Sequence, residues 1–146
     1  MGNYIYRLSL WFGHPDADLS EIPSRLGLSA NRVWKKGDPR TAPNGRIIGG
    51  VYHDSRGSIE FVGGKKSDLP KGLRAAIAAL KPHKAFLNEL SETGTKFSFF
   101  VGWFSDLNSR DVIDWEILRD LAELRISLDL DVYGPDGDGD VLLDPA

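Results

Sequence analysis

Residues 4–12, with the sequence YIYRLSLWF, are the stretch that decides the fold. Large apolar side chains at the even positions alternate with a second set that includes Arg7, Ser9 and Trp11. This period of two, rich in aromatic residues, is typical of a β-strand with one buried face. Residues 96–104 (KFSFFVGWF) and 125–133 (RISLDLDVY) carry further strand signals, so the sequence predicts a protein built on a β-sheet.

Helix signals separate these strands. The expected caps and stops are, in chain order, Asp18 and Gly27, then Ser67 or Asp68 and Gly94, then Ser109 or Asp111. Pro82 interrupts the second helix, and an interior proline costs about 3 kcal/mol unless the helix kinks, so we expect a bend near Lys81. Residues 46–54 and 58–62 are predicted to form a β-hairpin.

The order strand, turn, capped helix and strand describes residues 4–36 and describes residues 96–133 again. Two such halves predict the α+β class: a single two-layer domain with a mixed or largely antiparallel sheet and helices on one face. The halves share a pattern and not identical residues, so a β-α-β pseudo-repeat is an open alternative. We expect the domain to span residues 1–134, and residues 135–146 to form a flexible acidic tail.

Size and composition are those of an ordinary globular protein, with 146 residues and 41% hydrophobic content. The chain has no cysteine, which excludes a disulfide scaffold, thiolate catalysis and zinc–thiolate sites. Its first residues lack the features of a secretion signal, and no apolar run approaches the length of a membrane span. We therefore expect a cytoplasmic protein without membrane association.

Charge is distributed unevenly along the chain. Residues 1–104 contain 15 Lys/Arg and 9 Asp/Glu, whereas residues 105–146 contain 3 and 12. In one interpretation the two parts neutralise each other on a solvated surface. In the other, the protein offers an acidic face to a basic partner, or a basic face to an anion.

Residues 33–40 (VWKKGDPR) place a large aromatic ring among three cations and one carboxylate. In a structural interpretation Trp34 fills the core, while Asp38 pairs with Arg40 or caps a turn. In a functional interpretation Trp34 anchors a ligand or partner, and Lys36 and Arg40 hold an anion, because Trp and Arg are frequent at interface hot spots.

The second candidate site is the polar side of the sheet. If Leu128 and its alternating neighbours face the helices, Asp131 and Tyr133 point the other way, together with Arg7 and Trp11. Such a face is a recognition surface, or it is the solvated side of an ordinary antiparallel sheet with cross-strand charge pairs.

Four features together resemble a bacterial family known only as domain of unknown function family 4279. They are the opening strand, the helix that ends at residues 26–28 (LGL), the motif at residues 34–38 (WKKGD) and the closing residues 129–133 (DLDVY). The resemblance implies a stand-alone cytosolic α+β domain. It transfers no catalytic residue, because the family has no established activity.

No cofactor or metal is expected. The three histidines, His14, His53 and His83, lack metal-ligand spacing. Residues 136–140 (DGDGD) lack the glycine and glutamate positions of a calcium-binding EF-hand loop. Nucleic-acid binding is disfavoured because the sequence pI is about 5.6, whereas such domains are usually basic.

The leading hypothesis is a non-catalytic protein- or ligand-binding module, in one version an immunity-type protein that blocks a toxin with a basic surface. Its predicted binding residues are Trp34, Lys36, Asp38, Arg40, Arg7, Trp11, Asp131 and Tyr133. The alternative is a small hydrolase-like enzyme in which Asp38, His53 or Asp131 acts as acid or base. A third hypothesis is a homodimer that buries Trp11 or Trp103 symmetrically.

Overall fold

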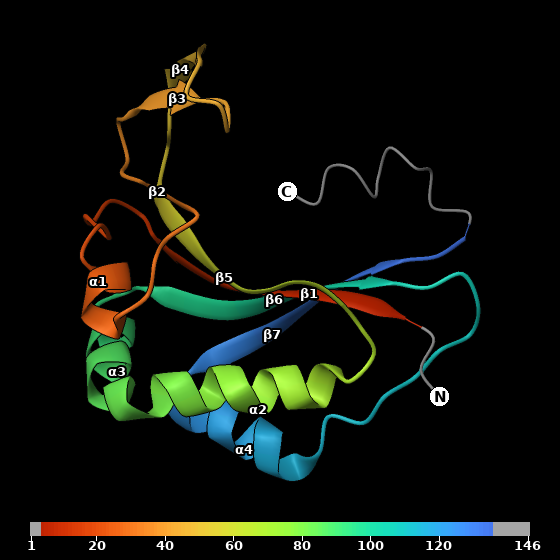
Figure 1. Cartoon of the computed structure of the whole chain (residues 1–146). Coiled ribbons are helices and arrows are strands. Elements are labelled where there is room, and N and C mark those ends of the chain that lie inside the picture. Colours follow the sequence, from red (N-terminus) through yellow and green to blue (C-terminus); the bar gives the residue numbers. More distant parts are fainter. Residues whose placement is uncertain (1–3, 136–146) are drawn as a thin grey trace.

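The fold is a mixed β-sheet with helices packed against one of its faces (Figure 1). The computed structural model describes residues 4–135 of the chain. Its elements are β1 (Ile5–His14), α1 (Ile22–Leu26), β2 (Arg32–Trp34), β3 (Pro39–Thr41), β4 (Ile47–Val51), β5 (Ser55–Lys66), α2 (Leu69–Leu80), the 3-10 turn η1 (Lys81–His83), α3 (Lys84–Glu92), β6 (Lys96–Phe104), α4 (Trp115–Leu124) and β7 (Ile126–Tyr133). The predicted α+β class is confirmed.

The main sheet has the strand order β2-β5-β1-β6-β7. β1 is antiparallel to both neighbours, β5 and β6, whereas β7 is parallel to β6. The second half of the predicted repeat, β6-α4-β7, therefore joins adjacent parallel strands. In the first half, β1 and β2 are also parallel to each other, because each is antiparallel to β5, which lies between them. The two halves therefore share the order of their elements, but their strands differ in position: β5 separates β1 from β2, whereas β6 and β7 are neighbours.

The core lies between the sheet and the helices, as the alternation in β1 predicts. The even-numbered side chains of this strand, Tyr6, Leu8, Leu10 and Phe12, are buried, whereas Arg7 on the other side is exposed. α2 and α4 cover them with the buried side chains Leu69, Leu73, Ala76, Ile77, Leu80, Ile117, Leu121 and Leu124. Full burial of such a side chain contributes about 1.5–3 kcal/mol, so this layer supplies most of the drive to fold.

The long helix begins and bends where the sequence predicts. The carboxylate of Asp68 accepts a hydrogen bond from the Lys71 backbone N–H, and Pro70 lies in the first turn, where its missing N–H costs nothing. The chain then passes through η1 at Pro82 and continues as α3. Gly27 ends α1 with φ of 72°, a left-handed conformation that favours glycine.

Two predicted helix caps are wrong. Asp18 accepts a hydrogen bond from the Ser20 backbone N–H in a local turn, and α1 begins later without a side-chain cap. α4 is capped by Asp114, whose Oδ1 accepts from the Ile117 N–H at 3.0 Å. The expected cap Asp111 is used elsewhere, since it accepts a hydrogen bond from the buried Tyr4 hydroxyl.

Tyr4 joins three parts of the molecule. Its hydroxyl donates to Asp111 and accepts from the Leu69 N–H, and its ring stacks on Trp103 with 3.7 Å between the ring centroids. Burial and the hydrogen bond to Asp111 raise the pKa of Tyr4 well above its ordinary value. The loop before α4 is thereby fastened to the first strand.

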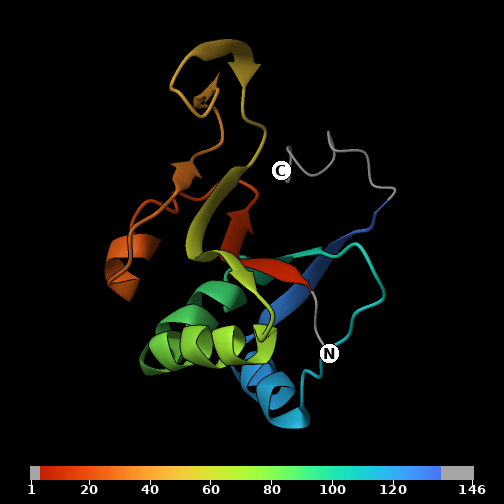
Figure 2. The same ribbon diagram turned by 45° about the vertical axis from the view of Figure 1, so that its right-hand side comes forward.

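The predicted hairpin between residues 46–54 and 58–62 is also wrong. β5 pairs with β1 on one side and with β2 on the other, so both of its hydrogen-bonding edges are occupied. β4 pairs instead with β3, and the two form a separate hairpin. We call residues 35–54 the arm, because this segment rises from the sheet on the side away from the helices (Figures 1 and 2).

No helix in the described part of the chain is long and apolar enough to cross a membrane.

Candidate functional site

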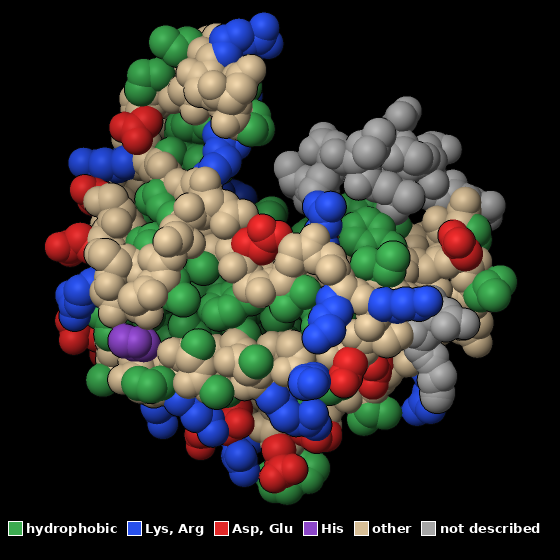
Figure 3. Space-filling view, viewed as in Figure 1, with side chains coloured by type: hydrophobic (Ala, Val, Ile, Leu, Met, Phe, Trp, Pro, Cys, Tyr) green, Lys and Arg blue, Asp and Glu red, His purple; other side chains and the backbone are tan. Residues whose placement is uncertain are grey.

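The side of the main sheet opposite the helices carries four cross-strand rows of side chains, and we call it the open face. In order along the strands the rows are Arg32, Ser58, Trp11, Ser98 and Ser127, then Glu60, Ser9, Phe100 and Asp129, then Arg7, Gly102 and Asp131, then Ile5, Phe104 and Tyr133. The arm stands beside this face, with a hollow between it and the rest of the surface (Figure 3).

Stacked aromatic pairs cross the open face. Trp11 stacks on Phe100 near its centre, with 4.7 Å between ring centroids and 11° between the planes. Phe104 stacks on Tyr133 at the far end, at 4.7 Å and 5°. Trp11, Phe100 and Phe104 are only partly buried, so their rings are accessible to a partner. Pairs of this kind add about 0.5–1.5 kcal/mol beyond their buried area.

A glycine makes the second pair possible. A Cβ atom at Gly102 would lie 3.2 Å from Cε2 and 3.3 Å from Cζ of Phe104. The ring of Phe104 therefore lies across the bare backbone of its own strand and reaches Tyr133. The Tyr133 hydroxyl donates a hydrogen bond to Asp131 Oδ2 at 2.6 Å, which holds that carboxylate at the end of β7.

The root of the arm is a cluster of Arg32, Trp34 and Tyr52. One guanidinium nitrogen of Arg32 donates to the Tyr52 hydroxyl at 2.7 Å and to the Thr41 carbonyl at 2.8 Å. The guanidinium carbon also lies 4.8 Å from the centre of the Trp34 ring. Burial alone would raise the pKa of Tyr52, but the hydrogen bonds with Thr41 and the charge of Arg32 outweigh it, so this pKa is lowered.

Trp34 itself lies on the open side of β2 and not in the core between sheet and helices. Its indole N–H is buried and has no hydrogen-bond partner in the described part of the chain. A buried polar group without a partner costs about 1–3 kcal/mol.

The polar residues that follow Trp34 form a turn. Asp38 Oδ2 accepts from the Lys35 N–H at 2.9 Å, and the Lys36 N–H donates to Ser55 Oγ at 3.0 Å. Asp38 therefore shapes the turn and forms no ion pair with Arg40. The side chains of Lys36 and Arg40 are exposed on the arm.

The three acid–base candidates are not brought together. Asp38 and His53 lie on the arm, beyond the β2 edge of the sheet, whereas Asp131 lies on β7 at the opposite edge. A hollow of about 390 Å³ lies at the far end of the sheet, and its lining includes Ile5, Lys66, Phe104 and Tyr133 but none of the three candidates.

The described residues contain no group of three or more histidine or acidic side chains that could hold a metal ion. Residues 136–140, considered above for calcium, lie outside the described residues, as does all of the expected acidic tail except Pro135.

His14 has a structural role. Its Nδ1 accepts hydrogen bonds from the Asp16 and Ala17 N–H groups, so Nε2 carries the proton that it donates to the Thr93 carbonyl.

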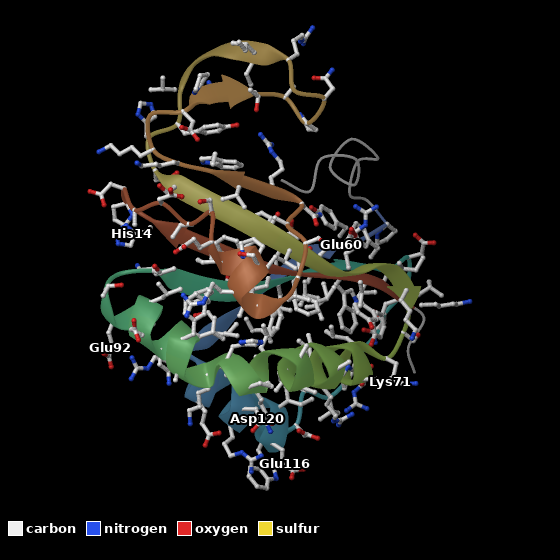
Figure 4. The ribbon with its side chains drawn as sticks, turned by 60° about the vertical axis from the view of Figure 1, so that its left-hand side comes forward. His14, Glu60, Lys71, Glu92, Glu116 and Asp120 are labelled. Carbon is white, nitrogen blue, oxygen red and sulfur yellow. The ribbon has the colours of Figure 1, made fainter. Side chains whose placement is uncertain are left out.

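Charges of the open face are separate from those of the helices. Figure 4 shows Glu60 at the sheet, whereas Lys71, Glu92, Glu116 and Asp120 lie on the helices.

The sequence interpretation missed four residues of the site: Arg32, Tyr52, Phe100 and Phe104. The alternation in residues 96–104 could have found the last two, because it assigns Phe100 and Phe104 to one side of the strand and Phe97 and Phe99 to the other.

Comparison with known proteins identifies a family. The family model described as "Domain of unknown function (DUF4279)" matches residues 4–135. No curated protein and no solved structure matches the chain.

Proposed function

Because this chain belongs to the DUF4279 family, whose description assigns no activity, we propose from its site alone that it is a non-catalytic module that binds a protein partner with its open face. The observation that carries this proposal is the partly exposed Trp11–Phe100 stack at the centre of a sheet face that no described helix covers.

The chemistry around this stack supports a protein partner. Aromatic and arginine side chains dominate the binding energy of protein interfaces, and they work best at the centre of the contact. Here Arg7 and Glu60, both exposed, lie within one or two positions of the stack on neighbouring strands. A partner that covers the rings would bury apolar area at about 25 cal/mol per Å² while the charges set its orientation.

An immunity-type role is one version of this proposal. Asp129 and Asp131 give the β7 side of the open face an acidic character. Opposite charge on the partner would accelerate encounter, so a toxin with a basic surface is a suitable ligand. This version is tested by the association rate with a candidate toxin, which should fall steeply as salt concentration rises.

The hydrolase-like alternative has less support. General acid–base catalysis requires the two groups to lie within hydrogen-bond reach of one substrate. Asp38 and His53 are separated from Asp131 by the width of the five-stranded sheet. A substrate that is turned over by the wild-type protein but not by Asp131→Asn would favour this alternative.

The proposal is tested by cross-linking in lysate of the native host, with three forms of the protein. The wild type should capture a defined partner, whereas Trp11→Ser should lose it. Trp115→Ser is the matched control, because Trp115 is equally aromatic and 68% exposed but lies on α4, on the other side of the sheet. Equal capture by all three forms, or by none, contradicts the proposal.

A further inference from the structure

Strand β4 of the arm is apolar and uncovered in the described structure. Ile47, Ile48 and Val51 of β4 are 69%, 46% and 46% exposed, and every residue of this strand is exposed. An isolated two-stranded hairpin is marginally stable in water. A hairpin of this composition that stands away from the sheet is typical of a segment that is covered by another molecule.

The arm is poorly suited to extend a sheet by backbone pairing. Pro39 in β3 has no N–H to donate. In β4, Gly49 and Gly50 have φ of 92° and 72° and lie between the two paired positions, so this strand carries more residues than β3 over the same span. Proline and bulges block strand addition at an edge. The arm therefore offers its side chains and not its backbone.

The arm and the opposite edge of the sheet are complementary. Residues 32–56, the arm and its root, contain six Lys/Arg and two Asp/Glu. β7, the edge strand at the other side, presents the carboxylates of Asp129 and Asp131 on the open face. One chain thus contains a basic, apolar arm and an acidic sheet edge, which cannot reach each other within the same molecule because the main sheet separates them.

A two-fold axis would bring these surfaces of two copies together. β1 is the central strand, with the arm beyond the β2 side and β7 at the other edge. If two open faces meet across an axis parallel to the strands, the arm of each copy comes over the β7 edge of the other. Trp11, on the central strand, then faces its own counterpart. Both contacts are made twice, so the pair is closed and leaves neither surface free.

We propose that the molecule covering the arm is a second copy of this chain, in a two-fold dimer in which each arm clasps the β7 edge of the other copy. This inference does not rest on the proposed function, since the dimer needs no other protein. The dimer covers the Trp11–Phe100 stack, so dimer formation and capture of a different partner compete.

Charge reversal with rescue tests the dimer. The arm variant is Arg40→Glu with Arg46→Glu, and the edge variant is Ser127→Arg with Asp129→Arg; the four side chains are exposed on the arm and on β7. Light scattering after size exclusion should give twice the 16.1 kDa chain mass for the wild type, and a concentration series should show each variant at least about tenfold weaker in self-association. Mixed together, the two variants should form a heterodimer, because every contact then joins opposite charges.

Two further forms complete the test. Lys71→Glu with Lys84→Glu reverses exposed charges on the helix side and should dimerise as the wild type does. Ile48→Asp should prevent dimerisation without a change in folded circular dichroism. A wild type that is monomeric at all soluble concentrations, or variants that fail to rescue each other, overturns the dimer. The arm variant keeps Trp11, so retained partner capture by this variant separates a failure of the dimer from a failure of the proposed function.

Discussion

The indole ring of Trp34 stacks on the phenol ring of Tyr52, with 4.3 Å between the ring centroids and 12° between the planes. Trp34 ends β2, and Tyr52 lies between β4 and β5, so this stack closes the base of the arm. Arg32 binds the Tyr52 hydroxyl and the Thr41 carbonyl and thereby fastens both sides of the arm to the sheet. The orientation of the arm thus depends on a few contacts at its root.

Tyr52→Ala should therefore free the arm without unfolding the sheet. We expect faster amide hydrogen exchange over residues 38–51 and faster trypsin cleavage after Arg40 and Arg46, which are both exposed. Tyr52→Phe keeps the stack but removes the hydrogen bond from Arg32, so it should give an intermediate rate. An arm that exchanges and is cleaved at the wild-type rate in Tyr52→Ala is held by other contacts, and this assignment is then wrong.

A second prediction sets helix propensity against packing. Gly72 lies inside α2, where alanine is normally favoured by about 1 kcal/mol. A Cβ atom here, however, would collide with the Tyr6 hydroxyl oxygen and lie 3.0 Å from Cζ of that ring. Tyr6 is 1% exposed and cannot easily move. Gly72→Ala should therefore lower the free energy of unfolding by about 1–3 kcal/mol, the usual cost of overpacking.

Urea denaturation in two backgrounds separates these effects. In the Tyr6→Phe background the hydroxyl is absent, so the same Gly72→Ala change should cost less and approach the gain expected from propensity. An equal loss in both backgrounds would mean that the hydroxyl oxygen is not the atom that excludes a side chain at position 72.

Much of the fold follows from local sequence. The alternation in residues 4–12 and the capping sequence before Pro70 identify β1 and α2 because each signal lies within a few neighbouring residues. The wrong caps show the limit of this approach: Asp111 has the residue type of a cap, but its carboxylate is bound to Tyr4, far away in the sequence. Strand pairing of β4 likewise depends on β5 having both edges occupied, which no local pattern records.

The candidate site was harder to predict for the same reason. Alternation correctly assigns Arg7, Trp11 and Asp131 to the face away from the helices. It does not reveal that Trp34 meets Tyr52, because that contact requires the chain to leave the sheet and return. The motif at residues 34–38 thus indicates a position where the chain changes direction, and the arm that follows is known only from the three-dimensional structure.

A third prediction concerns pH. A hydrogen bond from the Ile117 N–H, and then one from Arg74, lowers the pKa of Asp114 below its ordinary value of 3.8. A carboxyl with a lowered pKa in the folded state stabilises the protein above its unfolded pKa, and this contribution is lost as pH falls through the folded value. Asp114→Ala should therefore lower the thermal midpoint at pH 7, and the gap to the wild type should narrow below about pH 4. A gap that stays constant down to pH 2 would show that the ionised carboxylate is not the cap.

The last prediction compares two apolar side chains that the alternation pattern places on the same side of the sheet. Phe99 in β6 is fully buried and packs edge-on against Phe61, whereas Val132 in β7 is 65% exposed. β7 is an edge strand with a neighbour on one side only, so its end is poorly covered although its side chain points toward the helix layer. Phe99→Ala should lower the free energy of unfolding by about 3–5 kcal/mol, while Val132→Ala should change it by less than about 0.5 kcal/mol.

Denaturation at two protein concentrations makes this comparison sharper. In dilute solution Val132→Ala should match the wild type, because little apolar area is lost from the monomer. At concentrations where the proposed dimer forms the result should be the same, because the Val132 side chain points toward the helix layer and away from the open face that the dimer covers. A cost for Val132→Ala in dilute solution that approaches the cost of Phe99→Ala would place this side chain inside the monomer core and contradict the comparison.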